Sequence, residues 1–160
     1  MLALVYQAKG QPARARGQLS YALDLRPDYY PALAALVHAA HLARHRGEAI
    51  VLSQTALRLR PWDLDVRFLL GEMLWEEADV EGAYLELSRV VEARPDHLPA
   101  RRILVLVHAT KGDGKALASE LEDIIRLDPA DEAAKLDLGA AYRSLGRTDD
   151  AIAMYTSVIG

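Results

Sequence analysis

The sequence contains no cysteine, and aromatic side chains are scarce, with one phenylalanine, two tryptophans and seven tyrosines in 160 residues. The absence of cysteine excludes a disulfide framework and a thiolate metal site. Alanine and leucine dominate instead, and this mixture favours closely packed helices over a sheet. No apolar run approaches the roughly 20 residues of a membrane-spanning helix, so we expect no membrane insertion. No targeting segment is visible, so the compartment is unknown, and cytoplasm and periplasm both stay open.

Basic residues are not concentrated where a nucleic acid would need them. The net charge is −4, and the stretch 64–97 alone carries nine acidic residues against three basic ones. Binding of a nucleic-acid backbone requires a continuous basic track. The sequence therefore predicts no nucleic-acid partner.

Four prolines recur at a fixed interval of 34 residues. Each closes a similar phrase, and the four are Pro27, Pro61, Pro95 and Pro129. Such a period is typical of a solenoid built from one repeated unit. Counting back from each proline gives apolar residues at spacings of four and three, which place one narrow apolar stripe on a helix. Each unit therefore reads as helix–turn–helix.

The punctuation of the repeat gives the expected helices and their ends. Glycines at Gly10, Gly47, Gly112 and Gly146 mark the turns between the two helices of a unit. Acidic residues after the prolines are expected helix caps or first-turn charges: Asp28, Asp63, Asp96 and Asp131. Pro31 and Pro99 fit the first helical turn. The expected helices are 2–9, 13–26, 31–44, 48–60, 65–77, 81–94, 99–110, 115–127, 133–145 and 149–159.

These residues resemble the tetratricopeptide repeat (TPR) family, whose 34-residue pattern runs Leu-Gly-x2-Tyr, then Ala-x3-Phe, then Pro. The best match is Leu138-Gly139-Ala140-Ala141-Tyr142, followed by Ala151 and Tyr155. The resemblance covers the whole chain. It implies an all-α, right-handed α-solenoid of 34-residue helix–turn–helix repeats. We expect one TPR array over residues 1–160, with partial units 1–29 and 132–160 around full units 30–63, 64–97 and 98–131.

The resemblance also implies where a partner binds, because in this family the first helices of successive repeats line a concave groove. An apolar strip rimmed by charge is expected there, and such a surface commonly marks a binding site. The expected binding residues are His38, His41, Phe68, Leu69, Glu72, Trp75, Arg102, Ile103 and Leu106. The alternative is that Phe68 and Trp75 pack between helices. Glu72 and Glu76 are expected to meet Arg101 or Arg102 of the next unit, or a basic partner.

No residue pattern predicts chemistry. His38, His41 and His45 lie at steps of three and four, a spacing that can hold zinc, but no acid is fixed beside them. Glu72 and Glu76 are neighbours on one helix face rather than a catalytic pair. We therefore expect no metal, no cofactor and no enzymatic activity.

The sequence thus predicts a non-catalytic scaffold that binds a protein or peptide segment in its concave groove. Two alternatives stay open. The first is a substrate-recruiting repeat region of a larger enzyme, such as a transferase. The second is a structural scaffold in a secretion or polysaccharide-export assembly. The chain also reads as part of a longer array, so end-to-end self-association is expected through uncovered helix faces at both ends.

Overall fold

The computed structural model describes residues 12–159, and every regular element in that range is an α-helix. The helices are α2 (Pro12–Leu25), α3 (Tyr30–Leu42), α4 (Arg46–Leu59), α5 (Leu64–Glu76), α6 (Val80–Ala93), α7 (Leu98–Lys111), α8 (Gly114–Leu127), α9 (Glu132–Ser144) and α10 (Thr148–Ile159). The expected helices match these within about two residues at each end. The expected helix 2–9 lies outside the described residues.

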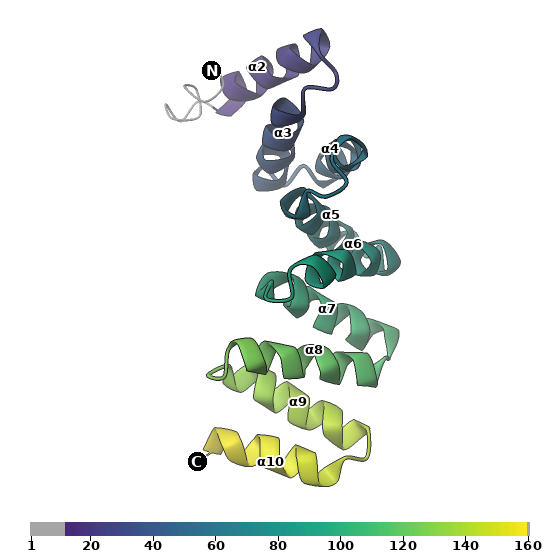
Figure 1. Ribbon diagram of the computed structural model, residues 1–160, viewed down its shortest axis with the longest axis vertical. Coiled ribbons are helices and arrows are strands. Elements are labelled where there is room, and N and C mark those ends of the chain that lie inside the picture. Colours follow the sequence, from purple (N-terminus) through teal and green to yellow (C-terminus); the bar gives the residue numbers. More distant parts are fainter. Residues whose placement is uncertain (1–11, 160) are drawn as a thin grey trace. The chain divides into compact units, whose positions relative to one another are not determined.

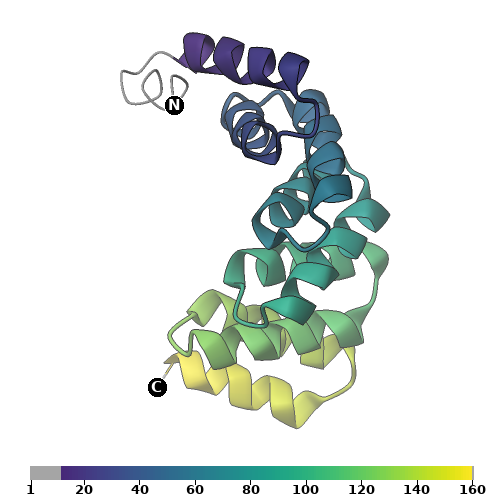
Figure 2. The same cartoon turned by 45° about the horizontal axis from the view of Figure 1, so that its top comes forward.

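The chain divides into two compact units, each longer than one repeat, and from here on the word unit refers to these two parts. The first unit ends at Asp79 and the second begins at Val80. In the first unit, consecutive helices from α2 to α5 pack against each other, and α3 also contacts α5. In the second unit, consecutive helices from α6 to α10 pack in the same manner. The antiparallel run of α8, α9 and α10 is clear in both views (Figures 1 and 2). Each unit therefore repeats the helix–turn–helix arrangement that the prolines predict.

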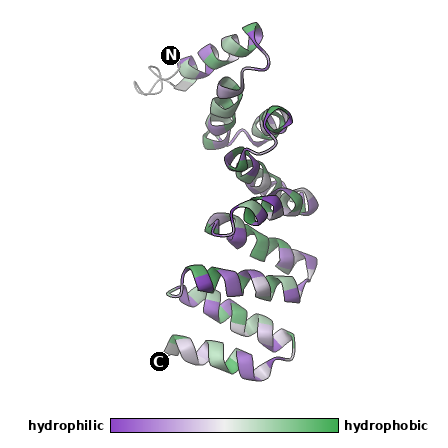
Figure 3. Cartoon of the chain, viewed as in Figure 1, coloured by the Kyte–Doolittle hydropathy of each residue, from purple (hydrophilic) through white to green (hydrophobic). Residues whose placement is uncertain are grey.

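Each unit has its own apolar core, built from the expected stripe. In the first unit, the small Ala49 and Ala56 of α4 are fully buried, and Val37 and Met73 pack in the same cluster. In the second unit, Leu121 and Ile124 of α8 lie among buried residues of α9. Figure 3 shows hydrophobic and hydrophilic residues interleaved along the helices, as expected for helices with one buried face. The alanines add almost no bulk, so neighbouring helices approach closely.

Two of the four expected aspartate caps are correct. Asp63 accepts hydrogen bonds from the backbone N–H groups of Asp65 and Val66, and Asp131 accepts one from Ala134. Asp28 and Asp96 are not caps, because each lies one residue further from its helix. Tyr29 stands at the α3 cap without a side-chain bond, and His97 caps α7 through Nδ1. Pro31 and Pro99 occupy the first helical turn as expected.

The turns between paired helices use one left-handed residue each, again at intervals of one repeat. Gly112 and Gly146 have φ of 70° and 75°, as their expected turn role requires. The equivalent positions in the first unit hold Arg44 and Ala78, with φ of 59° and 61°. The expected turn residue Gly47 is wrong, because it lies inside α4. Two turns are therefore built from residues for which the left-handed conformation costs free energy, whereas glycine adopts it freely.

Candidate functional site

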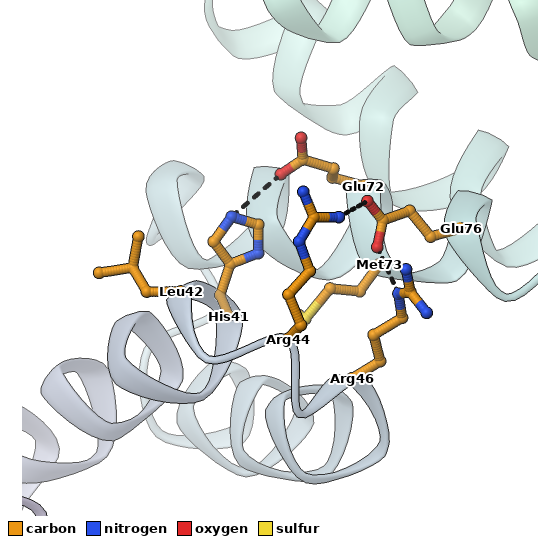
Figure 4. Close-up of a pocket in the computed structure, with 7 residues that line it drawn as sticks. All are labelled: His41, Leu42, Arg44, Arg46, Glu72, Met73 and Glu76. Atoms are coloured by element: carbon orange, nitrogen blue, oxygen red, sulfur yellow. Dashed lines mark hydrogen bonds and ion pairs between the residues drawn. The ribbon is translucent and has the colours of Figure 1, made fainter. Parts of the chain in front are cut away.

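A hollow of about 180 Å³ lies in the first unit, between α3, the start of α4 and α5 (Figure 4). Met73 lines it and belongs to the buried core, while charged side chains supply most of the remaining lining. Leu42 also lines the hollow and is 83% exposed. An exposed leucine beside a hollow is available to a partner molecule.

Two arginines close one side of this hollow by converging on one carboxylate. Nε of Arg46 lies 2.5 Å from Oε2 of Glu76, and Nη1 of Arg44 lies 3.3 Å from Oε1. Figure 4 shows both guanidinium groups pointing to Glu76. The hydrogen bond from Arg46 holds the pKa of the Glu76 carboxyl below its ordinary value, and the charge of Arg44 acts in the same direction. Glu76 is therefore ionised, and its carboxylate is paired with two arginines of the preceding repeat.

The second acid of the hollow, Glu72, has a weaker partner. Nε2 of His41 lies 3.5 Å from Oε2 of Glu72, at a separation that is a loose contact for a hydrogen bond. His38 is exposed, and His45 turns to Arg16 and Glu48 instead. Among residues 12–159, no three His, Cys, Asp or Glu side chains gather at one point in a way that could hold a metal ion. The structure therefore brings together His41 and Glu72, but not the three histidines.

The remaining expected binding residues of the first unit are more buried. Leu69 belongs to the core cluster, and Phe68 packs against that cluster from its side. Trp75 is half-buried. Phe68 and Leu69 therefore pack in or against the core of the first unit. A role of Phe68, Leu69 and Trp75 in binding stays a prediction.

The second unit contains a larger hollow, of about 500 Å³, between the C-terminal halves of α7 and α9 and the first half of α8. Its walls are apolar or small, and they include Val105, Leu106, Leu117 and Leu121. Leu106, an expected binding residue, is 49% exposed there. Leu117 stands where the earlier repeats have Ala15, Ala49 and Ala83. This hollow is roomy enough to accept a ligand group.

Two polar residues also line this second hollow, and one of them, His108, escapes sequence reasoning. Asp137 is exposed and has no hydrogen bond or ion pair with any described residue. His108 is only 7% exposed, and its buried Nδ1 has no hydrogen-bond partner within the described range. The ring of Tyr84 packs edge-on against His108, with 5.6 Å between ring centroids. The only sequence signal was that His108 stands where the best-matching repeat has Tyr142.

The expected partners of the arginines in α7 require a correction. Nη1 of Arg101 lies 2.6 Å from Glu120 and 2.8 Å from Asp123. Nη2 of Arg102 lies 2.7 Å from Asp131, and Ile103 beside it is half-buried. The expectation that Glu72 and Glu76 meet these arginines is wrong, because the arginines pair with acids that follow them in the chain. Glu72 and Glu76 pair with groups of the repeat that precedes them.

Comparison with solved structures establishes the fold. A crystal structure of MamA matches with a TM-score of 0.85 and 19% identity, over 99% of this chain and 93% of that one. YrrB, described as a TPR protein with an unusual peptide-binding site, matches with a TM-score of 0.84 and 22% identity, over 98% and 81%. The structure of pilF from Pseudomonas aeruginosa matches with a TM-score of 0.71 and 21% identity, over 99% of this chain and 72% of that one. The chain is thus an α-solenoid of TPR repeats, as the sequence predicted.

A family assignment follows from the sequence itself. The family model of the bacterial transcriptional activator domain matches residues 74–159, more than half of the chain, and the chain belongs to this family. A comparison with curated proteins gives no significant match. None of the described helices has the length and apolar character that a membrane span requires.

Proposed function

We propose that this chain is a non-catalytic scaffold that binds a peptide or protein segment along the first helices of its repeats. The observation that carries this proposal is that each unit has a hollow between two consecutive first helices, α3 and α5 in one and α7 and α9 in the other. Rigid helices that already hold such hollows lose little conformational entropy when a segment docks. The family description adds a setting, in which the segment serves a transcriptional activator.

The partner in this setting is a protein rather than DNA. The stretch 64–97 carries nine acidic and three basic residues, and a phosphate backbone would be repelled by it. In the first unit, we propose that His38, His41, Glu72 and Trp75 contact the partner, with Phe68 and Leu69 supporting them. In the second unit, Arg102, Ile103 and Leu106 take the same role.

Peptide selection from a displayed random library tests this proposal, using the whole chain as bait. Leu42→Ser should weaken binding of the selected peptides while leaving the melting temperature unchanged, because Leu42 is exposed. Trp75→Ala should weaken binding by about thirtyfold, the loss expected when a large aromatic anchor worth about 2 kcal/mol is removed.

Val51→Ser is the matched control, since Val51 is an exposed aliphatic residue of α4 that lines neither hollow. A wild-type chain that enriches no peptide contradicts the proposal. If Trp75→Ala lowers the melting temperature by several degrees and leaves affinity unchanged, Trp75 is a packing residue and the site lies elsewhere.

A further inference from the structure

The two hollows occupy the same place in the repeat. Six of the seven lining residues of the first hollow have a counterpart two repeats further along that lines the second hollow, and the register of the helices is the same in both units. The pairs are His41 and Ala109, Arg44 and Gly112, Arg46 and Gly114, Glu72 and Ala140, Met73 and Ala141, and Glu76 and Ser144. In each of these pairs, the large or charged side chain of the first hollow is replaced by glycine, alanine or serine in the second.

This replacement explains the difference in size. In the first unit, Arg44 and Arg46 fill the hollow by converging on Glu76, and about 180 Å³ is left. In the second unit no such side chains stand at the matching positions, and about 500 Å³ is left. The first hollow is therefore narrowed by the chain's own ion pairs. The second is open, and it is lined by the aliphatic side chains Val105, Leu106, Leu117 and Leu121.

The polar groups of the open hollow indicate what completes it. Asp137 is the one acidic residue in its lining, no Lys or Arg lines it, and within the described chain nothing pairs with this carboxylate. His108 lies in the same wall with its buried Nδ1 unpartnered. In the first hollow the carboxylate of Glu76 is neutralised by arginines of the chain itself. The open hollow has no such cation in its lining, so the exposed carboxylate of Asp137 is free to pair with a cationic group of a ligand.

We propose that the hollow between α7 and α9 anchors a partner peptide that carries a large apolar side chain close to a lysine or arginine. The apolar side chain fills the space that Arg44, Arg46 and Glu76 occupy in the first unit. The cationic side chain pairs with Asp137. This inference rests on the proposed peptide-binding function and assigns its anchoring site and the chemistry of its partner.

The test transplants the closing ion pair of the first unit into the second. Gly114→Arg with Ser144→Glu reproduces Arg46 and Glu76, and a Cβ atom on Gly114 would meet Cδ2 of Leu145 at 3.4 Å, an ordinary contact. A second variant, Ala140→Phe, blocks the hollow without charge. Its matched control is Ala133→Phe, at an exposed position of the same helix outside the hollow. Circular dichroism establishes that all variants are folded.

The measurement is selection from displayed random peptides, followed by fluorescence anisotropy with the enriched peptides. We expect the wild type to enrich a large apolar residue near a lysine or arginine. Both blocking variants should bind these peptides at least about tenfold more weakly, and Ala133→Phe should bind them normally. Asp137→Asn should lose the preference for the basic residue while keeping the apolar one. Asp149→Asn, which removes an exposed carboxylate of α10, should keep both.

The outcomes separate this inference from the proposed function. If peptides are enriched and both blocking variants bind them as tightly as the wild type, the anchoring site is refuted while peptide binding stands. Enrichment of acidic peptides, or an unchanged basic preference in Asp137→Asn, refutes the assigned chemistry. A wild-type chain that enriches nothing contradicts both proposals.

Discussion

Gly139 lies on α9 at a close approach to α10. Replacing it with alanine has two effects on stability, which have opposite signs and known sizes. A Cβ atom at this position would lie 2.6 Å from Cε1 of Tyr155 and 2.9 Å from Cδ1 and Cζ of the same ring. Alanine gains about 1 kcal/mol in helix propensity over glycine. Overpacking of this kind costs about 1–3 kcal/mol, because the ring must move. We expect Gly139→Ala to destabilise the fold by up to about 2 kcal/mol.

The sign of the effect should reverse once the ring is removed. In a Tyr155→Ala background, Gly139→Ala should stabilise the chain by about 1 kcal/mol, since only the propensity gain remains. Gly17→Ala is the control, because Gly17 lies in α2 and a Cβ atom added there would have no neighbour within 4 Å. It should stabilise in either background. Urea denaturation followed by circular dichroism measures the free energy of unfolding of each variant in both backgrounds. A Gly139→Ala variant more stable than the wild type would refute the close approach.

Three further predictions concern the turns, the caps and the buried ion pair. Ala78→Gly should raise the free energy of unfolding by up to about 1 kcal/mol in urea denaturation, because Ala78 has a φ of 61°. Asp131→Ala should cost about 1 kcal/mol at neutral pH. Backbone hydrogen bonding from Ala134, and then Arg102, lower the pKa of Asp131, so this difference should persist above about pH 4 and shrink as pH falls below it in urea titrations. Arg101→Ala should cost about 3 kcal/mol, because it leaves Glu120 without its partner and Asp123 with Arg126 alone. Arg126 pairs with Asp123 at an exposed site, so Arg126→Ala should cost less than about 1 kcal/mol in thermal melts.

The backbone could be predicted from the sequence because the repeat determines it many times over. The prolines end the second helices, and the glycines Gly112 and Gly146 have the left-handed turn conformation that their position requires. The errors fall where one position deviates from the shared pattern. Arg44 adopts the turn conformation although it is not glycine, and so the neighbouring Gly47 was misassigned. His97 caps α7 through its ring nitrogen, a role that is rarer than capping by aspartate.

The site was less predictable because side-chain partners depend on rotamers and on register between repeats. Glu76 reaches back to Arg44 and Arg46, whereas periodicity alone suggested a forward contact. Aligning the repeats two apart gives the missing signal, since it places Glu72 and Glu76 opposite small residues. That contrast is visible in the sequence, but only the structure shows that it leaves a hollow.

The consecutive packing of the helices has a consequence for how the chain reaches its fold. Within each unit, helices contact the next helix along the chain, with α3 and α5 as the one wider pairing among the described elements. Native contacts therefore join residues that are close in sequence, and little loop-closure entropy is lost before they form. During translation, each helix leaves the ribosome shortly before the helix against which it packs. Each helix finds its neighbour as soon as the next turn has been synthesised, so little apolar surface waits uncovered during translation.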